Sequence, residues 1–392
     1  MRFTPWLFVG SRLVTGCGDA EPEGSQPPAP LAFSRPLSAG AGHTCAIAAG
    51  GELWCWGSNP DGQLGDGTDG ILRATPGRVA TPSRAVSVAA GSYHTCALSE
   101  QGRVECWGWN VAGQLGDGTT TNRSSPYGVT SLTHVTGIAS GSYHSCALLS
   151  DGSAQCWGQN DLGQLGDGTR RDRALPASVF SLPPSQALAA SGRHSCALST
   201  EGTVQCWGGN EHGELGGSEP VRELPLPVPA LARVRAIAAG FNHSCALLGD
   251  GTVACWGSNS YGQLGDGTNL SSESPQVVLG LGGVTAIAAG YNHTCALQGS
   301  GALWCWGWNA SGQLGDGSGQ DQATPTRVLG LANVQAVAGG GFHSCAACAS
   351  GEVFCWGGSD SGQLGDGSLV DHFSPTAVPG FPGTAPLQGE QR

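Results

Sequence analysis

The feature that most constrains this chain is a unit of about 50 residues that occurs seven times. The units align on the motif "HTCAL" and its close variants. The histidines that mark them are His43, His94, His144, His194, His243, His293 and His343, at spacings of 51, 50, 50, 49, 50 and 50 residues. A near-constant period of this length indicates a repeat architecture in which each unit packs against its neighbours.

Each unit predicts four short β-strands. In the second unit the apolar run "VSVAAG" is followed by "HTCALS", "RVECWG" and "SPYGV". Short runs rich in Val, Ala, Cys and Trp and separated by glycine clusters are typical of strands. We therefore predict an all-β fold, a seven-bladed β-propeller with four short antiparallel strands per blade. A linear solenoid is the alternative, but the first and last units lack the polar caps that such an array needs.

A cysteine pair with a separation of ten residues recurs in every unit. The pairs are Cys45 and Cys55, Cys96 and Cys106, Cys146 and Cys156, Cys196 and Cys206, Cys245 and Cys255, Cys295 and Cys305, and Cys345 and Cys355. A glycine six residues after the first cysteine predicts a three-residue hairpin loop, Glu100 to Gly102 in the second unit. That register places Cys96 opposite Cys106, with Cα atoms about 4.5 Å apart. We predict one disulfide per blade and an oxidising compartment.

Two metal sites are alternatives to this interpretation, and we favour neither. A zinc ion would use the His and the two Cys, three ligands per blade, although zinc ligands usually lie closer together in sequence. Calcium would use the aspartates of the "GQLGDG" loops, namely Asp66, Asp117, Asp167, Asp266, Asp316 and Asp366. One carboxylate per loop is few for calcium, so we expect each Asp to stabilise a turn. We predict no metal and no cofactor.

The N-terminus "MRFTPWLFVGSRLVTGC" resembles a bacterial lipoprotein signal that ends at Cys17. We predict a signal segment over 1–17, a disordered Pro-rich tether over 18–30, the propeller over 31–380 and a C-terminal tail over 381–392. Cys17 would carry lipid, and the protein would be exported and either anchored to the bacterial envelope or secreted. Arg12 interrupts the apolar run, so a start that is not translocated is the alternative. If Cys17 carries lipid, Cys348 would be spare; if Cys17 has no lipid, a link between Cys17 and Cys348 is the alternative.

The pattern "AAG..HTCAL...G.V.CWG.N..GQLGDG" closely resembles the repeats of the regulator of chromosome condensation family. The resemblance covers residues 38–380 in all seven units and implies a seven-bladed propeller. Members of the family include a nucleotide exchange factor for a small nuclear GTPase, a plant ultraviolet receptor and a secreted bacterial inhibitor of β-lactamases. The resemblance therefore specifies the fold more closely than the function.

Several functions of that family fit this chain poorly. The unit spacing leaves no room for the inserted wedge on which the exchange factor depends. The net charge of −12 argues against nucleic acids and anionic lipid surfaces, so a membrane would be met only through the lipid anchor. Each "CWG" tryptophan recurs once per blade and is more simply core than photoreceptor. For the repeated histidines we expect a buried imidazole bonded to a backbone group of a neighbouring turn.

The residues that vary between units are the candidate binding residues. Strand alternation places the loop before each histidine and the loop after each "CWG" at one end of the propeller. The candidates on these loops are Tyr93, Trp109, Tyr143, Arg193, Phe241, Tyr291, Trp308 and Phe342. Aromatic and Arg side chains are enriched at binding hot spots, although the same rings could instead pack over the channel mouth. The fourth unit also departs, with His212, Glu214 and Gly217, either as a special surface or by drift.

These observations predict a non-enzymatic binding or scaffold protein of the bacterial envelope whose partner is a protein or peptide. We expect the chain to be a monomer. No nucleophile–base pair, carboxylate pair or phosphate loop lies outside the repeat pattern, which argues against catalysis. An enzyme of unrecognised type acting on saccharides, exchange factor-like activity implied by the resemblance, and a purely structural surface module are the alternatives.

Overall fold

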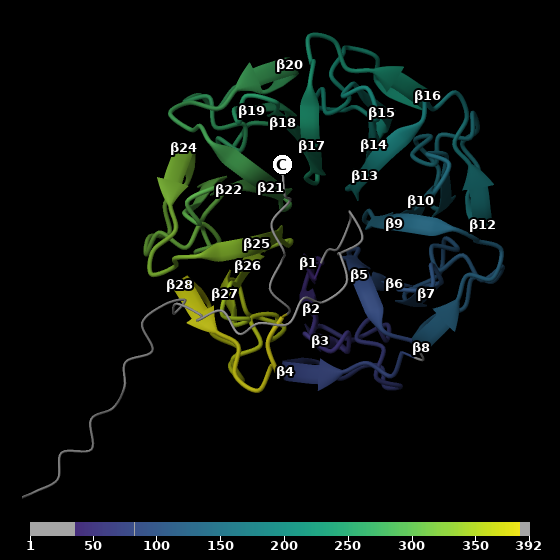
Figure 1. Ribbon diagram of the computed structural model, residues 1–392, viewed down its shortest axis with the longest axis horizontal. Helices are drawn as coiled ribbons and strands as arrows, with labels where there is room; N and C mark the ends of the chain where they lie inside the picture. The colour runs from purple at the N-terminus through teal and green to yellow at the C-terminus, as the bar shows by residue number, and fades with distance from the viewer. Residues whose placement is uncertain (1–35, 82, 385–392) are drawn as a thin grey trace, which may run out of the picture.

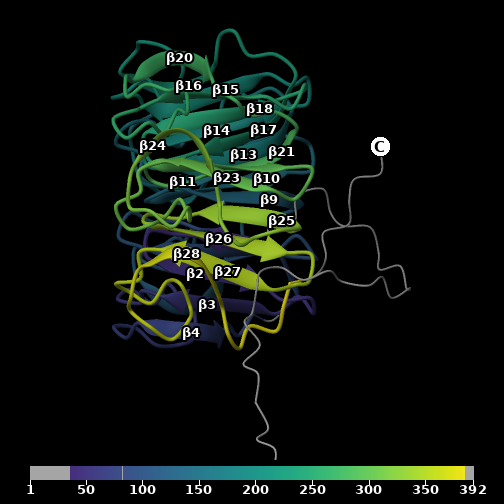
Figure 2. The same cartoon turned by 90° about the vertical axis from the view of Figure 1, so that its left-hand side faces the viewer.

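The computed structural model describes residues 36–81 and 83–384, which form a closed ring of seven four-stranded antiparallel sheets (Figure 1). The predicted seven-bladed β-propeller is confirmed. Within each sheet the strands follow one another in chain order, from the channel to the rim, so each blade derives from one sequence unit. Figure 2 shows that the strands run across the thickness of the ring, so their loops lie at its two ends.

The 28 strands of the described residues divide into seven blades of four. Blades 1 to 3 contain β1 (Leu37–Ala39), β2 (His43–Ile47), β3 (Leu53–Gly57), β4 (Arg73–Arg78), β5 (Ala85–Ala90), β6 (His94–Ser99), β7 (Val104–Gly108), β8 (Arg123–Gly128), β9 (Val135–Ser140), β10 (His144–Leu149), β11 (Ala154–Gly158) and β12 (Arg173–Ser178). Blades 4 and 5 contain β13 (Ser185–Ser191), β14 (His194–Ser199), β15 (Val204–Gly209), β16 (Val221–Pro227), β17 (Val234–Ala239), β18 (His243–Leu248), β19 (Val253–Gly257) and β20 (Ser272–Val277). Blades 6 and 7 contain β21 (Val284–Ala289), β22 (His293–Gln298), β23 (Leu303–Gly307), β24 (Gln322–Arg327), β25 (Val334–Gly339), β26 (His343–Cys348), β27 (Val353–Gly357) and β28 (His372–Ala377).

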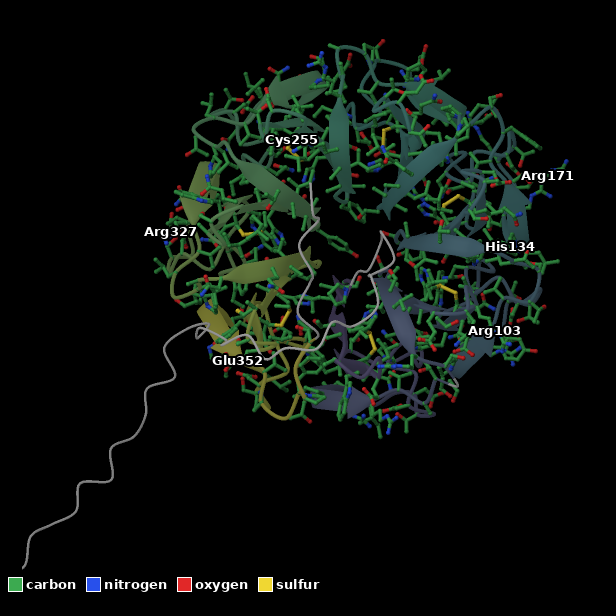
Figure 3. The ribbon with its side chains drawn as sticks, in the orientation of Figure 1. Arg103, His134, Arg171, Cys255, Arg327 and Glu352 are labelled. Carbon is green, nitrogen blue, oxygen red and sulfur yellow. A yellow bond between two sulfur atoms is a disulfide. The ribbon has the colours of Figure 1, made fainter. Side chains whose placement is uncertain are left out.

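The two middle strands of each blade form the predicted hairpin. In blade 2 the Ser99 N–H donates to the Arg103 carbonyl at 2.9 Å, and Gly102 adopts a φ of +74° in the loop between them. Cys96 consequently lies opposite Cys106, and the two form a disulfide with Cα atoms 4.1 Å apart. All seven predicted pairs form such disulfides, one within each blade (Figure 3). Their sulfurs are therefore not available as the thiolates that zinc would need.

The core lies between the blades and is formed by seven similar apolar clusters. In one of them Leu98 and Val104 of blade 2 pack with Ile138 and Trp157 of blade 3. The tryptophans of the seven "CWG" motifs are all fully buried, namely Trp56, Trp107, Trp157, Trp207, Trp256, Trp306 and Trp356. Burial of so large a side chain is a main source of stability, so these residues belong to the core as the sequence indicated.

A hydrogen-bonded relay crosses every seam between neighbouring blades. Between blades 2 and 3, the Ser145 hydroxyl donates to the Gln114 carbonyl at 3.0 Å, and Trp157 Nε1 donates to the same carbonyl at 2.8 Å. Ser145 Oγ also lies 2.8 Å from His94 Nε2. Because the hydroxyl has already donated its one proton, it accepts from His94 Nε2–H. Burial, together with His144 and His43, lowers the pKa of His94 to about 3, which keeps this imidazole neutral.

The same contact repeats around the ring and corrects one expectation. The seven pairs are His43–Thr95, His94–Ser145, His144–Ser195, His194–Ser244, His243–Thr294, His293–Ser344 and His343–Thr44. The expected backbone partner was wrong, because each histidine bonds to a side-chain hydroxyl of the next blade. The residue that bears this hydroxyl immediately follows the histidine of the next blade in sequence, so the "HTC" or "HSC" motifs of neighbouring blades are joined by a hydrogen bond.

The two ends of the described chain meet between blades 7 and 1, where the ring closes. Strand β1 is only three residues long, and the segment after β28 supplies contacts that the preceding linker makes in other blades. The Ala49 N–H donates to the Gly383 carbonyl at 2.9 Å, and the Thr384 N–H donates to the Gly351 carbonyl at 2.8 Å. Phe381 packs against Trp54 and Trp56 of blade 1. Closure thus combines this segment with the His343–Thr44 bond.

Some sequence predictions fall on residues that the structure does not describe. The signal segment, Cys17, the tether and residues 385–392 lie outside the described part of the chain. Cys348 does lie within it, buried at the end of β26, and it takes part in a disulfide, so the expectation that it is spare was wrong. Across residues 36–81 and 83–384, no helix has the length and apolar character needed to cross a membrane.

Candidate functional site

The loops before the histidines and the loops after the "CWG" motifs lie at the same end of the ring, which we call the loop face. The two kinds of loop are joined directly by backbone hydrogen bonds. In blade 2 the Trp109 N–H donates to the Tyr93 carbonyl at 2.9 Å, and in blade 6 the Trp308 N–H donates to the Asn292 carbonyl at 2.8 Å. The strand alternation expected from the sequence therefore holds, and the variable positions of each blade are neighbours in space.

The glycine of each "CWG" motif positions the variable residue that follows it. Gly108 has a φ of +103°, and a Cβ atom there would lie 2.6 Å from the Tyr93 carbonyl oxygen and 2.8 Å from His94 Cα. Only glycine fits so close to the neighbouring strand. The chain turns at this point. Trp107 is fully buried in the core, whereas Trp109, two residues later, is half-buried on the loop face.

One aromatic cluster on the loop face spans blades 2 and 3. Its members are Tyr93, Trp109 and Tyr143, three of the residues selected from the sequence. The Trp109 and Tyr143 ring centroids are 5.1 Å apart in an edge-to-face arrangement, and Tyr93 lies 6.4 Å from Trp109 and 6.0 Å from Tyr143. Tyr93 is 39% exposed, whereas the other two are half-buried. Packing of this kind restricts the rings before any partner arrives.

A second aromatic cluster spans blades 5 to 7. It joins Phe241 to Tyr291, Tyr291 to Phe342, and Phe342 to Trp308, with ring centroids 4.8, 5.9 and 5.6 Å apart. Tyr261 extends the cluster, with its ring centroid 6.0 Å from that of Trp308. Sequence reasoning missed Tyr261, although the variable loop between "CWG" and "GQLG" contained the signal. Phe342 and Tyr261 are exposed, and the others are half-buried.

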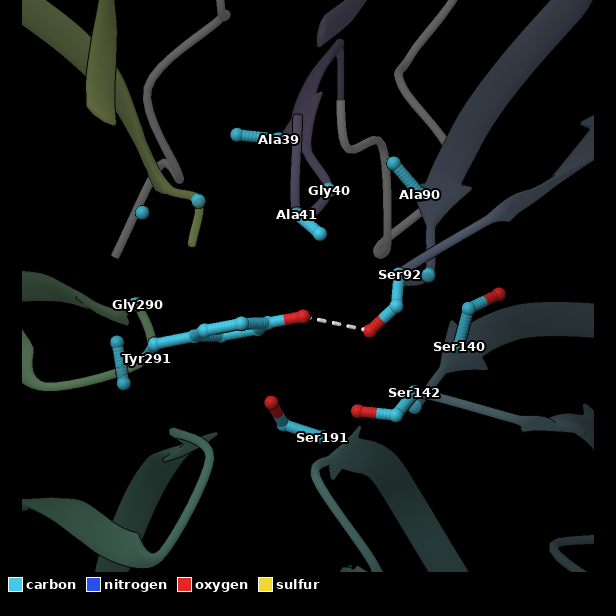
Figure 4. A pocket seen from close by; sticks show the side chains of 15 residues that line it. Ala39, Gly40, Ala41, Ala90, Ser92, Ser140, Ser142, Ser191, Gly290 and Tyr291 are labelled. Atoms are coloured by element: carbon cyan, nitrogen blue, oxygen red, sulfur yellow. Dashed lines mark hydrogen bonds between the residues drawn. The ribbon is translucent and has the colours of Figure 1, made fainter. Parts of the chain in front are cut away.

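Tyr291 closes the mouth of the central channel. Its ring extends from blade 6 across the channel to blade 2, where its hydroxyl is 2.7 Å from Ser92 Oγ (Figure 4). Burial is the main cause that raises the pKa of this phenol to about 12. Below it the inner strands enclose a hollow of about 370 Å³ lined mainly by Ala, Ile and Val side chains. For Tyr291 the structure therefore agrees with the alternative to a binding role, namely that its ring packs over the channel mouth.

Arg193 forms an ion pair on the loop face. Its guanidinium donates to the Asp161 carboxylate of blade 3 at 2.9 Å, and both side chains are 44% exposed. Arg193 therefore contributes to the loop face as part of a charge pair. An exposed pair of this kind adds little to stability.

The "GQLGDG" loops form a rigid support around this face. Asp117 accepts hydrogen bonds from the Thr119 N–H at 2.9 Å and hydroxyl at 2.7 Å, and it pairs with Arg123. Burial acts to raise the pKa of Asp117, but the bonds from Thr119, Arg123 and Asn110 outweigh it and lower that pKa. The predicted role of these aspartates in turns is confirmed in this loop, where protein donors occupy the oxygens that calcium would need.

The fourth blade differs from the others at a buried position and at a half-buried one. Glu214 stands where six blades have Gln, and it accepts the His212 N–H at 2.8 Å as those glutamines do from their own loops. Burial raises the pKa of Glu214 to about 7. Gly217 replaces the loop aspartate, and Arg222 pairs instead with Glu219 and the Leu215 carbonyl.

A hollow of about 430 Å³ lies on the loop face over blade 1. Blade 1 has Gly42 at the position immediately before the histidine, where every other blade has a larger side chain, and Ala41 and Ser58 also line the hollow. The walls come from blades 2, 6 and 7 and include Tyr93, Trp308, Phe342 and Asp360. The hollow is therefore bounded by both aromatic clusters, a feature that the sequence did not reveal.

The ring of seven units, with an aromatic loop face on identical seams, defines a class of propeller built from regulator of chromosome condensation repeats. The family model "RCC1-like domain" matches residues 17–229 and 185–388, and the chain belongs to that family. The resemblance stated from the motif is confirmed. Family membership shows the fold and is consistent with a binding or scaffold role.

Several known proteins share parts of the sequence. RCC1 domain-containing protein 1 of Mus musculus is 41% identical over 101 residues, which cover 24% of this chain and 26% of that protein. The Ultraviolet-B receptor UVR8 of Arabidopsis thaliana is 39% identical over 95 residues, or 24% of this chain and 22% of the receptor. The probable E3 ubiquitin-protein ligase HERC3 of Homo sapiens is 44% identical over 92 residues, only 9% of its length. The chain thus spans about a quarter or less of these relatives.

Solved structures match over much more of the chain. Prp20p from Saccharomyces cerevisiae, described with its binding properties to Gsp1p and histones, has a TM-score of 0.76 at 26% identity. The match covers 83% of this chain and 85% of Prp20p. Human WBSCR16 has a TM-score of 0.71 at 25% identity, and the match covers 84% of this chain and 92% of WBSCR16.

Proposed function

We propose that this protein is a non-enzymatic binding protein that presents its loop face to a protein or peptide partner. The observation that carries the proposal is the concentration of variable aromatic side chains at one end of an otherwise repeated ring. Seven disulfides and seven hydrogen-bonded seams hold the loops, so their side chains lose little freedom on binding. The protein partners of Prp20p, namely Gsp1p and histones, agree with a protein ligand of this fold.

The experiment removes one tryptophan from each aromatic cluster. We expect Trp109→Ala with Trp308→Ala to weaken partner binding roughly tenfold or more, because truncated aromatic anchors cost about 2 kcal/mol or more. Binding is measured by quantitative pull-down from envelope extract, followed by titration of the captured protein. The melting temperature should change little.

Tyr127→Ala is the matched control for that experiment. Tyr127 is also an exposed aromatic residue, at 47%, but it lies on the outer strand β8 and not on the loop face. The control should bind the partner as the native protein does. If the double variant instead melts much earlier and still binds, the rings belong to the scaffold and the proposal is wrong.

We also propose that the protein is exported and held at the bacterial envelope. Seven disulfides support an oxidising compartment, and the sequence before Cys17 supports lipid attachment there. The fourteen blade cysteines pair with one another and Cys348 takes part in a further disulfide, so lipid at Cys17 requires that this disulfide does not use the Cys17 sulfur. We expect membrane fractionation to release a Cys17→Ala variant into the soluble fraction. Native protein recovered from the cytosol with free thiols would contradict export.

A further inference from the structure

The repeat allows the same position to be compared in blades 3 and 7. Asp161 is the third residue after Gly158 of its "CWG", and Asp360 is the third residue after Gly357. Asp161 reaches the next blade, where Arg193 immediately precedes His194, and the two form the ion pair at 2.9 Å. The position equivalent to Arg193 beside Asp360 is Gly42, immediately before His43. Blade 4 also has a carboxylate here, Glu211, and the residue before His243 is Asn242. The ring thus has one carboxylate with a guanidinium partner and one, Asp360, with glycine in place of that partner.

The hollow over blade 1 occupies the space that this missing side chain leaves. Gly42 and Asp360 both line it, and Asp360 is the only charged residue among the side chains that do. Within the described residues, Asp360 makes no ion pair. The free carboxylate therefore faces a space that has no cation of its own.

The walls of the hollow suit a planar cation. Tyr93, Trp308 and Phe342 contribute aromatic rings from three different blades, and Ser58, Ser92 and Ser361 contribute hydroxyls. An Arg guanidinium is attracted to aromatic faces and pairs with carboxylates through directional hydrogen bonds. The net charge of −12 also favours approach of a cationic segment.

We propose that this hollow binds an arginine side chain of the partner, whose guanidinium pairs with Asp360 as Arg193 pairs with Asp161. The inference rests on the proposed binding function and names the chemistry of the partner, a protein or peptide segment with an exposed Arg. Tyr93 and Trp308 flank the incoming side chain.

The backbone of Gly42 permits a direct internal test. Gly42 does not have a positive φ, and a Cβ atom there would lie 3.4 Å from Ser58 Cβ and 3.7 Å from Ser361 Oγ, which is ordinary contact. A side chain at this position should therefore enter the hollow without disturbing the fold. Gly42→Arg would reproduce the arrangement of blades 3 and 4 and occupy the site from within.

The experiment titrates the native protein with acetyl-Gly-Gly-Arg-Gly-Gly-amide and with the same peptide carrying citrulline, which has the shape of Arg without its charge. Binding is followed by NMR through the Trp308 indole N–H, assigned with Trp308→Phe. We expect saturable binding of the Arg peptide and roughly tenfold weaker binding of the citrulline peptide. Asp360→Asn should reduce the affinity for the Arg peptide to that for the citrulline peptide, and Gly42→Arg should abolish binding of both peptides.

Asp61→Asn is the control, because Asp61 is another loop-face carboxylate that does not line the hollow. It should leave the preference for Arg unchanged. Equal binding of the two peptides, or equal effects of Asp360→Asn and Asp61→Asn, overturns the inference. If Gly42→Arg does not fold, the exposed Asp360→Asn decides the matter alone. The two proposals can fail separately. If the Trp109→Ala, Trp308→Ala variant loses partner binding but Asp360→Asn binds the partner as the native protein does, the arginine site is overturned and the proposed function stands.

Discussion

The seams between blades repeat the same residues around the ring, whereas the loop face does not. Each seam has the same buried His, hydroxyl, carbonyl and Trp, whereas the loop face changes from blade to blade. A buried polar group that loses its partner costs the full desolvation penalty, so loss of any one of these four groups should destabilise its seam. Loop-face side chains retain contact with water, and their replacement costs little. The difference indicates which positions maintain the ring and which are available to a partner.

The largest effect should come from removing a seam tryptophan. We expect Trp157→Ala to lower the free energy of unfolding by about 3–5 kcal/mol, because it leaves a cavity and removes the Nε1 bond to the Gln114 carbonyl. Trp109→Ala, two residues from the equivalent Trp107, should cost far less. Urea unfolding of both variants with the disulfides intact measures the contrast. Equal losses would mean that Trp109 belongs to the core.

Removing one disulfide should have the next largest effect. We expect Cys146→Ala with Cys156→Ala to cost about 2–3 kcal/mol, because the unfolded chain gains freedom and the native hairpin keeps its strand hydrogen bonds. Thermal unfolding measures the loss, and the shape of the loop face should persist in the folded variant. Complete unfolding at room temperature would show that the seams cannot hold a blade without its disulfide.

Glu214 tests a seam that keeps its backbone carbonyl while the side chain of the residue that supplies it changes from Gln to Glu, and the effect of this residue depends on pH. Its pKa is about 7 in the folded protein and 4.5 as the ordinary value, so the folded state binds more protons between these limits. Stability from this group is therefore present below about pH 4.5 and is lost as the pH rises to about 7. Glu214→Gln should raise the free energy of unfolding by about 1–3 kcal/mol at pH 8 and change it little at pH 4.

Urea unfolding of Glu214→Gln and of the native protein at both pH values checks this expectation. Gln164→Glu, which places the same acid in blade 3, is the matched variant and should lower the free energy of unfolding at pH 8 and change it little at pH 4. A Glu214→Gln variant whose stability gain is the same at both pH values would show that the carboxyl does not titrate in this window.

The smallest effect should come from the loop-face ion pair. We expect Arg193→Ala to change the free energy of unfolding by less than about 1 kcal/mol, since both partners are substantially exposed. Salt titration of the melting temperature should show the same weak dependence for the variant and the native protein. A loss comparable with that of Trp157→Ala would mean that the loop face is not independent of the seams.

Much of the fold follows from local patterns in the sequence. The period of the histidine motif predicts seven blades, and the glycine six residues after each first cysteine predicts the hairpin that brings Cys96 to Cys106. These inferences succeed because hairpin register and strand alternation depend on residues close together in the chain. The location of the variable loops at one end follows from the same alternation.

The contacts between blades required the tertiary structure. His94 and Ser145 lie in different units, and no pattern within one unit states which group an imidazole will meet. The ring closure by Gly383 and Thr384, the position of Tyr291 across the channel and the inclusion of Tyr261 in an aromatic cluster depend equally on how blades are placed around the axis.

The sequence by itself thus determined the number of blades, the strands, the disulfides and the end of the ring at which variation gathers. Only the tertiary structure decided that Asp161 has a guanidinium partner and that Asp360 and Gly42 line the same hollow. Both pairs join residues of successive units, and Asp360 and Gly42 are at opposite ends of the chain. A pattern read along the chain specifies backbone geometry within a unit, but side-chain partners across a seam depend on the closure of the whole ring.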